Sequence, residues 1–341
     1  MTWPIMSNSC YENISDLSPT KIGLRAGYLA IIGFFGIVGN IFLLISLFLD
    51  KRIKSAINYL VINHTCLDLL QSGVRLPLYI VNIIMNSNGL GYELCTFHGF
   101  ISGIYFIGTT YTLTAMAIFR YLVVCQSPAV KLAPRHAIYA IVLVWIIAII
   151  MCLLPFWGLS HYDYNIIERS CLPTWNEGLA NQINAVFESL IDFGLPLLTT
   201  FICYLKIYTV LRKIKTDLMR YRCESISANT CQYSSDRAKK RFTLTLSILF
   251  LNFLLCFTVW SIISFIVYPV TAGTACVPDD LHYFAISLLY LNSALNPLIF
   301  FARMRSLRMK FYFILETMTG RKQPETTLAT SGTKRNNTIE R

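Results

Sequence analysis

Long stretches without a charged side chain are the feature that most constrains how this chain folds. Five stretches without Asp, Glu, Lys or Arg are each near or above the roughly 20 residues that a helix needs to cross a bilayer. They are residues 26–49, 96–119, 137–162, 242–278 and 281–302. Two more apolar stretches contain isolated charges, 55–92 with Asp68 and Arg75, and 178–205 with Glu188 and Asp192. The sequence therefore predicts seven membrane-spanning helices.

The overall composition agrees with a membrane location. Of 341 residues, 55% are hydrophobic and only 14% are charged, which is too apolar for an ordinary soluble protein. We therefore predict an all-α membrane protein, a seven-transmembrane helix bundle with a short amphipathic eighth helix. The predicted spans are 26–49, 56–82, 94–124, 136–157, 181–211, 238–268 and 280–302. The expected divisions are an extracellular N-terminal tail (1–24), the bundle (25–302), an amphipathic helix (303–318) and a cytoplasmic tail (319–341).

The distribution of basic residues predicts which ends of the spans face the cytoplasm. All 29 Lys and Arg except Lys21, Arg25, Arg75 and Arg169 lie in or beside the first, third and fifth loops and the C-terminal tail. Cytoplasmic segments are enriched in these residues, so we expect an extracellular N-terminus in the plasma membrane. The net charge of +11 then belongs to a cytoplasmic face toward anionic lipid, and we expect no nucleic-acid partner.

This topology places two kinds of modification on the extracellular side. The sequence Asn-Ile-Ser at Asn13 is an acceptor motif for an N-linked glycan. Cys95 stands at the outer start of the third span and Cys171 lies in the second outer loop, both in oxidising space, so we expect a disulfide between them. Cys10 and Cys276 could form a second outer bridge.

The sequence contains no pattern typical of an enzyme or of a cofactor site. It has no phosphate-binding glycine loop and no Cys-x-x-Cys pair. Its five histidines are scattered, at His64, His98, His136, His161 and His282. We therefore expect neither catalysis nor an organic cofactor.

Residues on all seven predicted spans resemble one known family. They are Gly39 and Asn40, Leu67-Asp68-Leu69, Cys95 and Phe119-Arg120-Tyr121, Trp145, Pro196 and Tyr204, Phe253 and Cys256, and the segment NSALNPLIFF at 292–301. The basic amphipathic stretch RMRSLRMKFYFIL follows. From residue 25 to about 318 the chain resembles the rhodopsin-like (class A) G-protein-coupled receptors. The resemblance implies a receptor that converts binding of an extracellular ligand into activation of a heterotrimeric G protein.

The resemblance also implies which residues couple the receptor to its cytoplasmic partners. They are Arg120, Tyr121, Tyr204, Asn296, Pro297 and Phe300. Pro297 removes a backbone hydrogen bond and bends the seventh helix, which permits hinging. Hydroxyl residues in the C-terminal tail could accept phosphate and recruit an arrestin-like partner, as they do in the family.

Asp68 lies near the middle of the second span, where a carboxylate is costly unless it is paired, protonated or solvated. The resemblance implies that it belongs to a sodium site or a water-filled pocket. The other members of this predicted site are Thr109, Asn292, Ser293 and Asn296. The alternative is a structural polar network that stabilises helix packing.

Some positions depart from the family pattern. Phe119 replaces the acid that usually precedes the arginine, and Lys239 stands where an acid often completes a lock. Without those acids Arg120 lacks the ion pairs of the resting state, so we predict raised basal activity. Phe257, Val259 and Phe300 replace a Trp, a Pro and a Tyr of the family, and the losses of the Pro and the Tyr oppose that effect.

The predicted ligand pocket is defined by charges at the outer ends of the spans. Glu188 and Asp192 are four residues apart, on one helix face, and Arg75 lies at a similar depth. We predict a cationic or zwitterionic ligand whose positive group meets the two acids. The other predicted pocket residues are Ser102, Phe106, Tyr290, Trp260 and His98. The alternative is that these charges satisfy one another and water at the rim.

Two other classes of protein remain open on the sequence alone. One is a seven-helix transporter or channel, with Asp68, Arg75, Glu188 and Asp192 along an ion path. The other is a seven-helix receptor that does not signal and acts as a decoy or partner. Inverted repeats would favour the transporter, and the sequence has none that we recognise.

Overall fold

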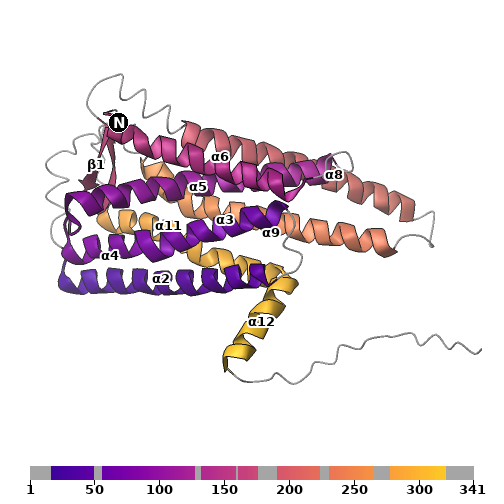
Figure 1. The fold of residues 1–341 in the computed structure, drawn as a ribbon, viewed down its shortest axis with the longest axis horizontal. Helices are drawn as coiled ribbons and strands as arrows, with labels where there is room; N and C mark the ends of the chain where they lie inside the picture. Colours follow the sequence, from indigo (N-terminus) through magenta and orange to yellow (C-terminus); the bar gives the residue numbers. More distant parts are fainter. Residues whose placement is uncertain are drawn as a thin grey trace, which may run out of the picture.

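A computed structural model of the chain describes residues 17–49, 56–126, 132–158, 160–175, 190–222, 230–264 and 277–319. Within these residues seven helical spans are long and apolar enough to cross a membrane. The helices pack side by side in one bundle (Figure 1). The predicted seven-helix fold is therefore confirmed.

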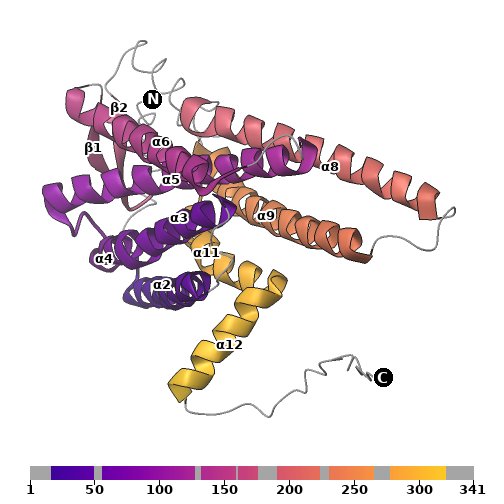
Figure 2. The same cartoon turned by 45° about the vertical axis from the view of Figure 1, so that its right-hand side comes forward.

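Each span is a single helix or a helix continued by a short irregular turn. In chain order they are α2 (Pro19–Phe48); α3 (Ala56–Leu70), the π-helical turn η1 (Gln71–Arg75) and α4 (Leu76–Met85); α5 (Gly91–Cys125); α6 (Pro134–Leu153) with the 3-10 turn η2 (Leu154–Trp157); the π-helical turn η3 (Leu190–Gly194) with α8 (Leu195–Arg222); α9 (Thr230–Ile262); and α11 (Asp279–Arg303). Helix α12 (Arg305–Thr319) leaves the bundle at an angle, as Figure 2 shows.

The first helix begins earlier than predicted. Residues 19–24 were expected in the N-terminal tail but form the first turns of α2. Pro19 has the backbone angle that suits a first helical turn, and the Ser18 side chain accepts a hydrogen bond from the Lys21 backbone N–H at 3.3 Å. This capping moves the helix start ahead of the uncharged stretch.

The later boundaries differ where polar sequence continues a helix. Helix α9 already begins at Thr230, before the predicted 238, because its first turns are polar and carry no hydropathy signal. Parts of the predicted fifth and sixth spans, 181–189 and 265–268, lie outside the described residues, as do residues 1–16 of the N-terminal tail. The predicted glycan acceptor Asn13 therefore lies outside them too.

A two-stranded hairpin, which the sequence did not predict, covers one end of the bundle. Strand β1 (Ser160–Asn165) pairs antiparallel with β2 (Ser170–Trp175). Cys171 of β2 forms a disulfide with Cys95 in the first turns of α5, which confirms the predicted bridge. Cys10 and Cys276 both lie outside the described residues.

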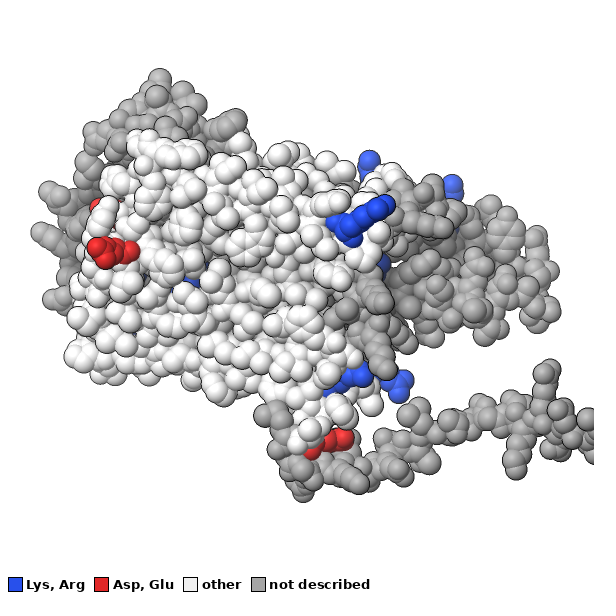
Figure 3. All heavy atoms as spheres, in the orientation of Figure 1, with Lys and Arg blue, Asp and Glu red and all other residues white. Residues whose placement is uncertain are grey.

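The two ends of the bundle differ in charge. We call them the hairpin end, where β1 and β2 lie, and the α12 end (Figure 1). In the view of Figure 3, blue Lys and Arg atoms gather toward the α12 end, and red acidic atoms lie at the hairpin end and on α12. This is the charge asymmetry that the positive-inside rule uses.

Helix α5 runs through the centre of the bundle, and 72% of the residues in its most apolar 18-residue stretch are buried. Near the α12 end, Met116 and Phe119 of α5 pack with Leu249 of α9 and Phe300 of α11 in one apolar cluster. Phe119, where the family has an acid, is only 8% exposed. Because α5 touches most other spans, its side chains contribute to polar sites at several depths.

Candidate functional site

A partly open cavity of about 180 Å³ lies under the hairpin and between the helices. We call it the hairpin cavity. Its polar lining includes Arg75, Ser102, Glu168 and Asp192. The rest of its wall is mainly apolar and aromatic, which is typical of small-molecule sites in proteins.

Arg75 is the buried cation of the hairpin cavity. It ends the π-helical turn η1 and is 8% exposed. Its Nε donates to the Ser102 hydroxyl at 2.7 Å, and its Nη1 donates to the Gln71 side-chain oxygen at 2.8 Å. The guanidinium also lies 4.7 Å from the ring centre of Tyr290. These partners are neutral, so they fix the direction of the guanidinium without acting as a contacting counterion.

No acidic side chain within the described part of the chain forms an ion pair with Arg75 at 4.0 Å or less. Basic groups at the rim behave differently, since Arg25 contacts both Asp279 and Asp280 at 2.6 Å. A buried charge without a counterion is costly, and in membrane spans it usually serves a function. The sequence also allowed the pocket charges to pair with one another. Among the described residues, Arg75 forms no such pair.

Asp192 is an acidic residue of the cavity lining, and it lies just before α8. It lies in the π-helical turn η3, and such turns often occur at functional sites. Its Oδ1 atom is buried and has no hydrogen-bond partner among the described residues. Glu188, the second acid predicted for this face, lies outside the described residues.

Aromatic rings form the inner wall of the cavity. The ring centre of Phe106 lies 5.6 Å from that of Phe257 and 5.8 Å from that of Phe193. Trp260 packs edge-on against Phe106 at 6.3 Å. Phe257, which departs from the family's Trp, thus lines the cavity and stacks on Phe253 at 4.2 Å.

The other predicted pocket residues fall into two groups. Ser102, Phe106 and Trp260 line the cavity as predicted. Tyr290 contacts Arg75 and stacks on Tyr79, but it is not part of the cavity lining. His98 is fully buried in α5 with both ring nitrogens unpartnered in the described structure, and it is also outside the lining.

Glu168 is a cavity residue that the sequence analysis missed. It lies in the turn between β1 and β2, yet it is only 3% exposed. Its Oε1 accepts a hydrogen bond from Trp260 Nε1 at 3.0 Å. Burial raises the pKa of this carboxyl to about 7. In the sequence, only the neighbouring Cys171 could have indicated that Glu168 lies in the cavity, because a loop tied to α5 must lie over the bundle mouth.

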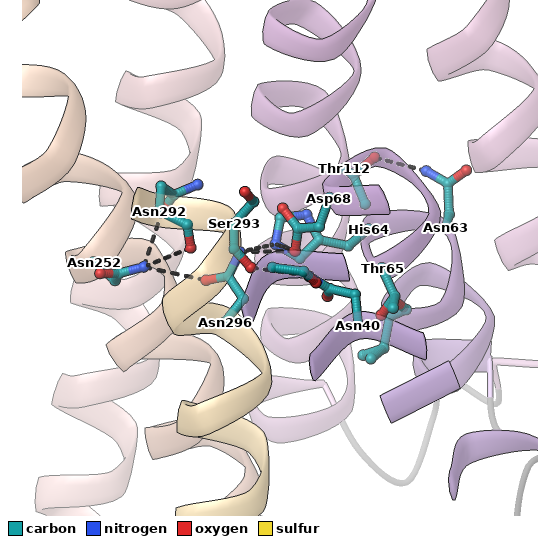
Figure 4. Close-up of polar contacts among 12 residues, drawn as sticks. Asn40, Asn63, His64, Thr65, Asp68, Thr112, Asn252, Asn292, Ser293 and Asn296 are labelled. Atoms are coloured by element: carbon teal, nitrogen blue, oxygen red, sulfur yellow. Dashed lines mark hydrogen bonds and ion pairs between the residues drawn. The ribbon is translucent and has the colours of Figure 1, made fainter. Parts of the chain in front are cut away.

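A second polar region, the mid-bundle network, lies deeper among the helices (Figure 4). The Asn296 amide donates to Asp68 Oδ2 at 2.9 Å, and His64 Nε2 lies 3.1 Å from the same amide nitrogen. Asn252 of α9 donates to the side-chain oxygens of Asn292 at 2.9 Å and Asn296 at 3.2 Å. The network therefore connects the second, sixth and seventh spans.

The first span joins the same network. The Asn40 amide donates to the Ser293 carbonyl at 3.0 Å, and the Ser293 hydroxyl lies 3.0 Å from that of Ser72. Close packing makes this possible: a Cβ on Gly36 would lie 2.3 Å from the Ser72 hydroxyl oxygen. Four of the five residues predicted for a sodium site, all except Thr109, hydrogen-bond within the network or with its neighbours.

Two buried oxygens near this network keep free acceptor capacity. Asp68 Oδ1 and the Thr109 hydroxyl are buried and have no hydrogen-bond partner in the described structure. Both belong to the predicted sodium site. Carboxylate and hydroxyl oxygens are the ligand type that hard cations prefer, so the residues present fit such an ion.

The predicted coupling residues lie toward the α12 end. Arg120 is 5% exposed, Phe300 is fully buried, and Pro297 lies inside α11. Tyr204 of α8 stacks on Phe250 of α9 at 5.6 Å. Lys206 lies over the ring of Tyr121 at 5.5 Å, which joins α8 to α5. The side chain of Lys239 lies outside the described part.

Comparisons with known proteins agree with this architecture. Residues 39–300 match the model of the 7 transmembrane receptor (rhodopsin family). The human melatonin receptor type 1B is 27% identical over 285 residues, covering 82% of this chain and 74% of the receptor. The melatonin receptor type 1A of Phodopus sungorus is 25% identical over 295 residues, covering 83% and 77%.

A solved structure has the same fold. The crystal structure of squid rhodopsin superposes with a TM-score of 0.77, covering 95% of each chain at 18% identity. The family match spans most of the chain, including the cavity and the mid-bundle network. The chain therefore belongs to the rhodopsin family of seven-transmembrane receptors, and it is a ligand-activated, G-protein-coupled receptor in the membrane and not an enzyme.

Proposed function

We propose that this receptor lies in the plasma membrane with its hairpin end outside and binds a small zwitterionic ligand in the hairpin cavity. The basic α12 end supports a cytoplasmic position for that end. The disulfide at the hairpin end suits the oxidising extracellular side. Family membership gives no support to the transporter, channel or decoy alternatives.

The buried guanidinium of Arg75, which no acid of the described residues contacts within 4.0 Å, is the observation that carries this proposal. Ser102 and Gln71 accept hydrogen bonds from two of its nitrogens, so the guanidinium is already oriented before a ligand binds. A carboxylate or another anionic group would supply the missing counterion. Guanidinium groups bind carboxylates through two parallel hydrogen bonds, so such a contact is also directional.

Asp192 supplies a matching site for a positive group. Its unpartnered Oδ1 lies in the lining of the same cavity. The aromatic wall of Phe106 and Trp260 would hold the ligand's apolar part and could attract a cation over a ring face. A zwitterion can therefore contact both Arg75 and Asp192 with groups of opposite charge, which a singly charged ligand cannot do.

The cavity volume limits the size of the ligand. It is about 180 Å³, below the roughly 300 to 1,000 Å³ of drug-sized pockets. We therefore expect a ligand of about amino-acid size, or a larger one that displaces part of the hairpin.

A second candidate is an uncharged aromatic ligand. The names of the relatives indicate receptors for melatonin, which has no charged group at neutral pH. The aromatic wall of the cavity suits such a ring. Arg75 and Asp192 would then remain without a contacting group of opposite charge, which makes this the weaker candidate.

The test is a ligand panel on intact cells with G-protein readouts. The panel contains the aromatic amino acids as small zwitterions, their amides and esters, and melatonin. If a zwitterion activates the wild type, Arg75→Gln and Asp192→Asn should each weaken the response at least about 30-fold, as loss of a buried charge pair does. Lys21→Gln, at the same end but outside the cavity, is the matched control.

Two outcomes would contradict the proposal. One is activation by melatonin alone, with no zwitterion active. The other is a zwitterion response that survives both substitutions. Surface expression of every variant is measured by an N-terminal epitope on unpermeabilised cells, which also reports whether the N-terminus is extracellular.

We propose that ligand binding reaches the G protein through a shift between packed states of α9 and α11. The ligand would contact Trp260 of α9 directly, and α9 and α11 share the mid-bundle network through Asn252 and Asn292. A change in that packing would alter the α12 end, where a G protein and then an arrestin-like protein would bind. Sodium held by Asp68 and Thr109 would favour one of the two states.

A further inference from the structure

The turn between β1 and β2 is built to point inward. The side-chain oxygen of Asn165 accepts hydrogen bonds from the backbone N–H groups of Ile167 at 2.9 Å and Glu168 at 3.0 Å. Arg169 has a φ of 49°, a left-handed conformation that a non-glycine residue adopts rarely. These features fix the turn in the shape that places the Glu168 side chain inside the bundle.

This turn is tied to three spans through both side-chain and backbone contacts. Arg169 Nη1 donates to the Asn86 side-chain oxygen at 2.5 Å, and its Nη2 contacts Asp279 at 3.3 Å. The Arg169 carbonyl accepts from Asn82 at 3.3 Å. The disulfide of Cys171 adds α5 to α4 and α11. These contacts hold the turn against the bundle.

The Glu168 carboxylate has an unusual environment for a structural group. It is 3% exposed and lies in the lining of the hairpin cavity with Arg75. Over the described residues, no basic side chain comes within 4.0 Å of it. In the cavity wall, the indole N–H of Trp260, on α9, donates a hydrogen bond to its Oε1 atom.

We infer that Glu168 is an internal ligand of this receptor, whose carboxylate occupies the place beside Trp260 that the acidic group of an external ligand takes. The inference rests on the proposed use of the hairpin cavity as the ligand site. An external carboxylate would then find both Trp260 Nε1 and Arg75, once the Glu168 side chain has turned out to solvent. The Glu168–Trp260 bond meanwhile links the hairpin to α9 in the ligand-free receptor.

The position of Glu168 should depend on extracellular pH. Burial raises the pKa of Glu168 to about 7, whereas a solvated glutamate stays near 4.3. The buried position therefore binds the proton more tightly and is favoured as pH falls. Between pH 8 and pH 6 the ratio of buried to released Glu168 should rise about tenfold by linkage. Alkaline conditions favour release.

Other titratable and charged groups face Glu168 from the surrounding elements. Tyr79 of α4 and Tyr290 of α11 interact with it electrostatically, as does Arg75 of η1. Arg169 adjoins it in the turn, and Asp192 of η3 lines the same cavity. His98 of α5 and His282 of α11 are buried at the same end of the bundle. A variant of Glu168 itself is therefore needed to assign any pH effect.

Cys152 provides a probe that needs no ligand. It lines the hairpin cavity, is 3% exposed and is not in a disulfide. Full-length receptor on intact cells is treated with methyl methanethiosulfonate, a small neutral thiol reagent that the carboxylate does not attract. The rate of modification at Cys152 is read by mass spectrometry of its peptide, for wild type, Glu168→Gln and Glu168→Ala.

Glu168→Gln keeps the hydrogen-bond acceptor and cannot ionise, so it should stay buried at every pH. The ratio of the wild-type rate to the Glu168→Gln rate should be near 1 at pH 6 and rise to between about threefold and tenfold at pH 8. The same thiol reacts in both proteins, so the effect of its own ionisation on the rate cancels in this ratio. Glu168→Ala should react faster than Glu168→Gln at both pH values.

A wild-type to Glu168→Gln ratio that stays constant from pH 6 to pH 8 would overturn the inference, as would equal rates for Glu168→Ala and Glu168→Gln. Trp260→Phe removes the donor and should also speed modification, which tests the inference even where Glu168→Ala fails to reach the surface. None of these readouts uses an agonist. Failure of the zwitterion screen with a positive thiol result would therefore retire the ligand class and leave Glu168 as an occupant of the cavity.

Discussion

The hairpin cavity and the mid-bundle network both bury polar side chains among apolar helices, but they satisfy them in different ways. In the network, Asp68 receives a hydrogen bond from Asn296, and side-chain amides of α9 and α11 bond to one another. In the cavity, among the described residues, Arg75 has no acidic group within 4.0 Å and Asp192 Oδ1 has no hydrogen-bond partner. Polar groups that bond mainly to one another suit an element that changes packing, and buried groups without a contacting counterion suit a site completed from outside.

Loss of the disulfide should have the largest effect and should fall on the cavity side of this comparison. Cys171→Ser removes a bridge between residues 76 positions apart, and the loss of a native disulfide typically costs about 2 to 5 kcal/mol. We expect poor surface expression and a clearly lower melting temperature in detergent. Cys66→Ser, at an exposed position, is the control, and equal melting temperatures for the two variants would refute the expectation.

A break in the mid-bundle network should cost somewhat less. Asn296→Ala leaves Asp68 Oδ2 buried without its donor, which should lower the free energy of unfolding by about 1 to 3 kcal/mol. Thermal unfolding of purified receptor measures this. Leu298→Ala on the exposed side of α11 should change stability much less. Equal losses for the two variants would mean that the network contributes no more than surface packing.

The prediction of raised basal activity can be tested at position 119. Phe119→Asp restores an acid beside Arg120, and a partly buried ion pair of about 1 to 3 kcal/mol would lower ligand-free signalling by roughly one to two decades. Second-messenger assays at matched surface levels measure this. Phe119→Leu controls for the lost ring in the apolar cluster. Wild-type cells with no signal above empty cells would end the hypothesis.

The sodium proposal carries the smallest expected effect. Sodium at about ten times its dissociation constant would stabilise the receptor by roughly 1.4 kcal/mol. The melting temperature should therefore be higher in sodium chloride than in choline chloride at equal ionic strength. Asp68→Asn and Thr109→Val should abolish the difference. A difference that persists in both variants would assign the effect to the salt and not to these oxygens.

The sequence predicted the mid-bundle network better than the cavity. Residues such as Asp68, Asn292 and Asn296 stand out because each is polar within an apolar span, and helical rise converts sequence position into depth. His64, beside Asp68, was passed over as one of several scattered histidines, although its spacing of four residues places it on the same helix face.

The cavity could be predicted only in part, because a loop decides its shape. Glu168 looks like one of several solvated loop acids, and its depth depends on the hairpin register and the Cys95–Cys171 bridge. Arg75 and Asp192 were predicted, but the π-helical turns that carry them were not. No hydropathy pattern reports such turns.

The central claim is that Arg75 binds an acidic group of the ligand, and a four-way comparison tests it most directly. The first active zwitterion and its carboxamide are compared on wild type and on Arg75→Gln by concentration–response curves. The wild type should prefer the carboxylate at least about 30-fold, and Arg75→Gln should show less than about threefold preference. An undiminished preference in Arg75→Gln would place the anion site elsewhere and contradict the account.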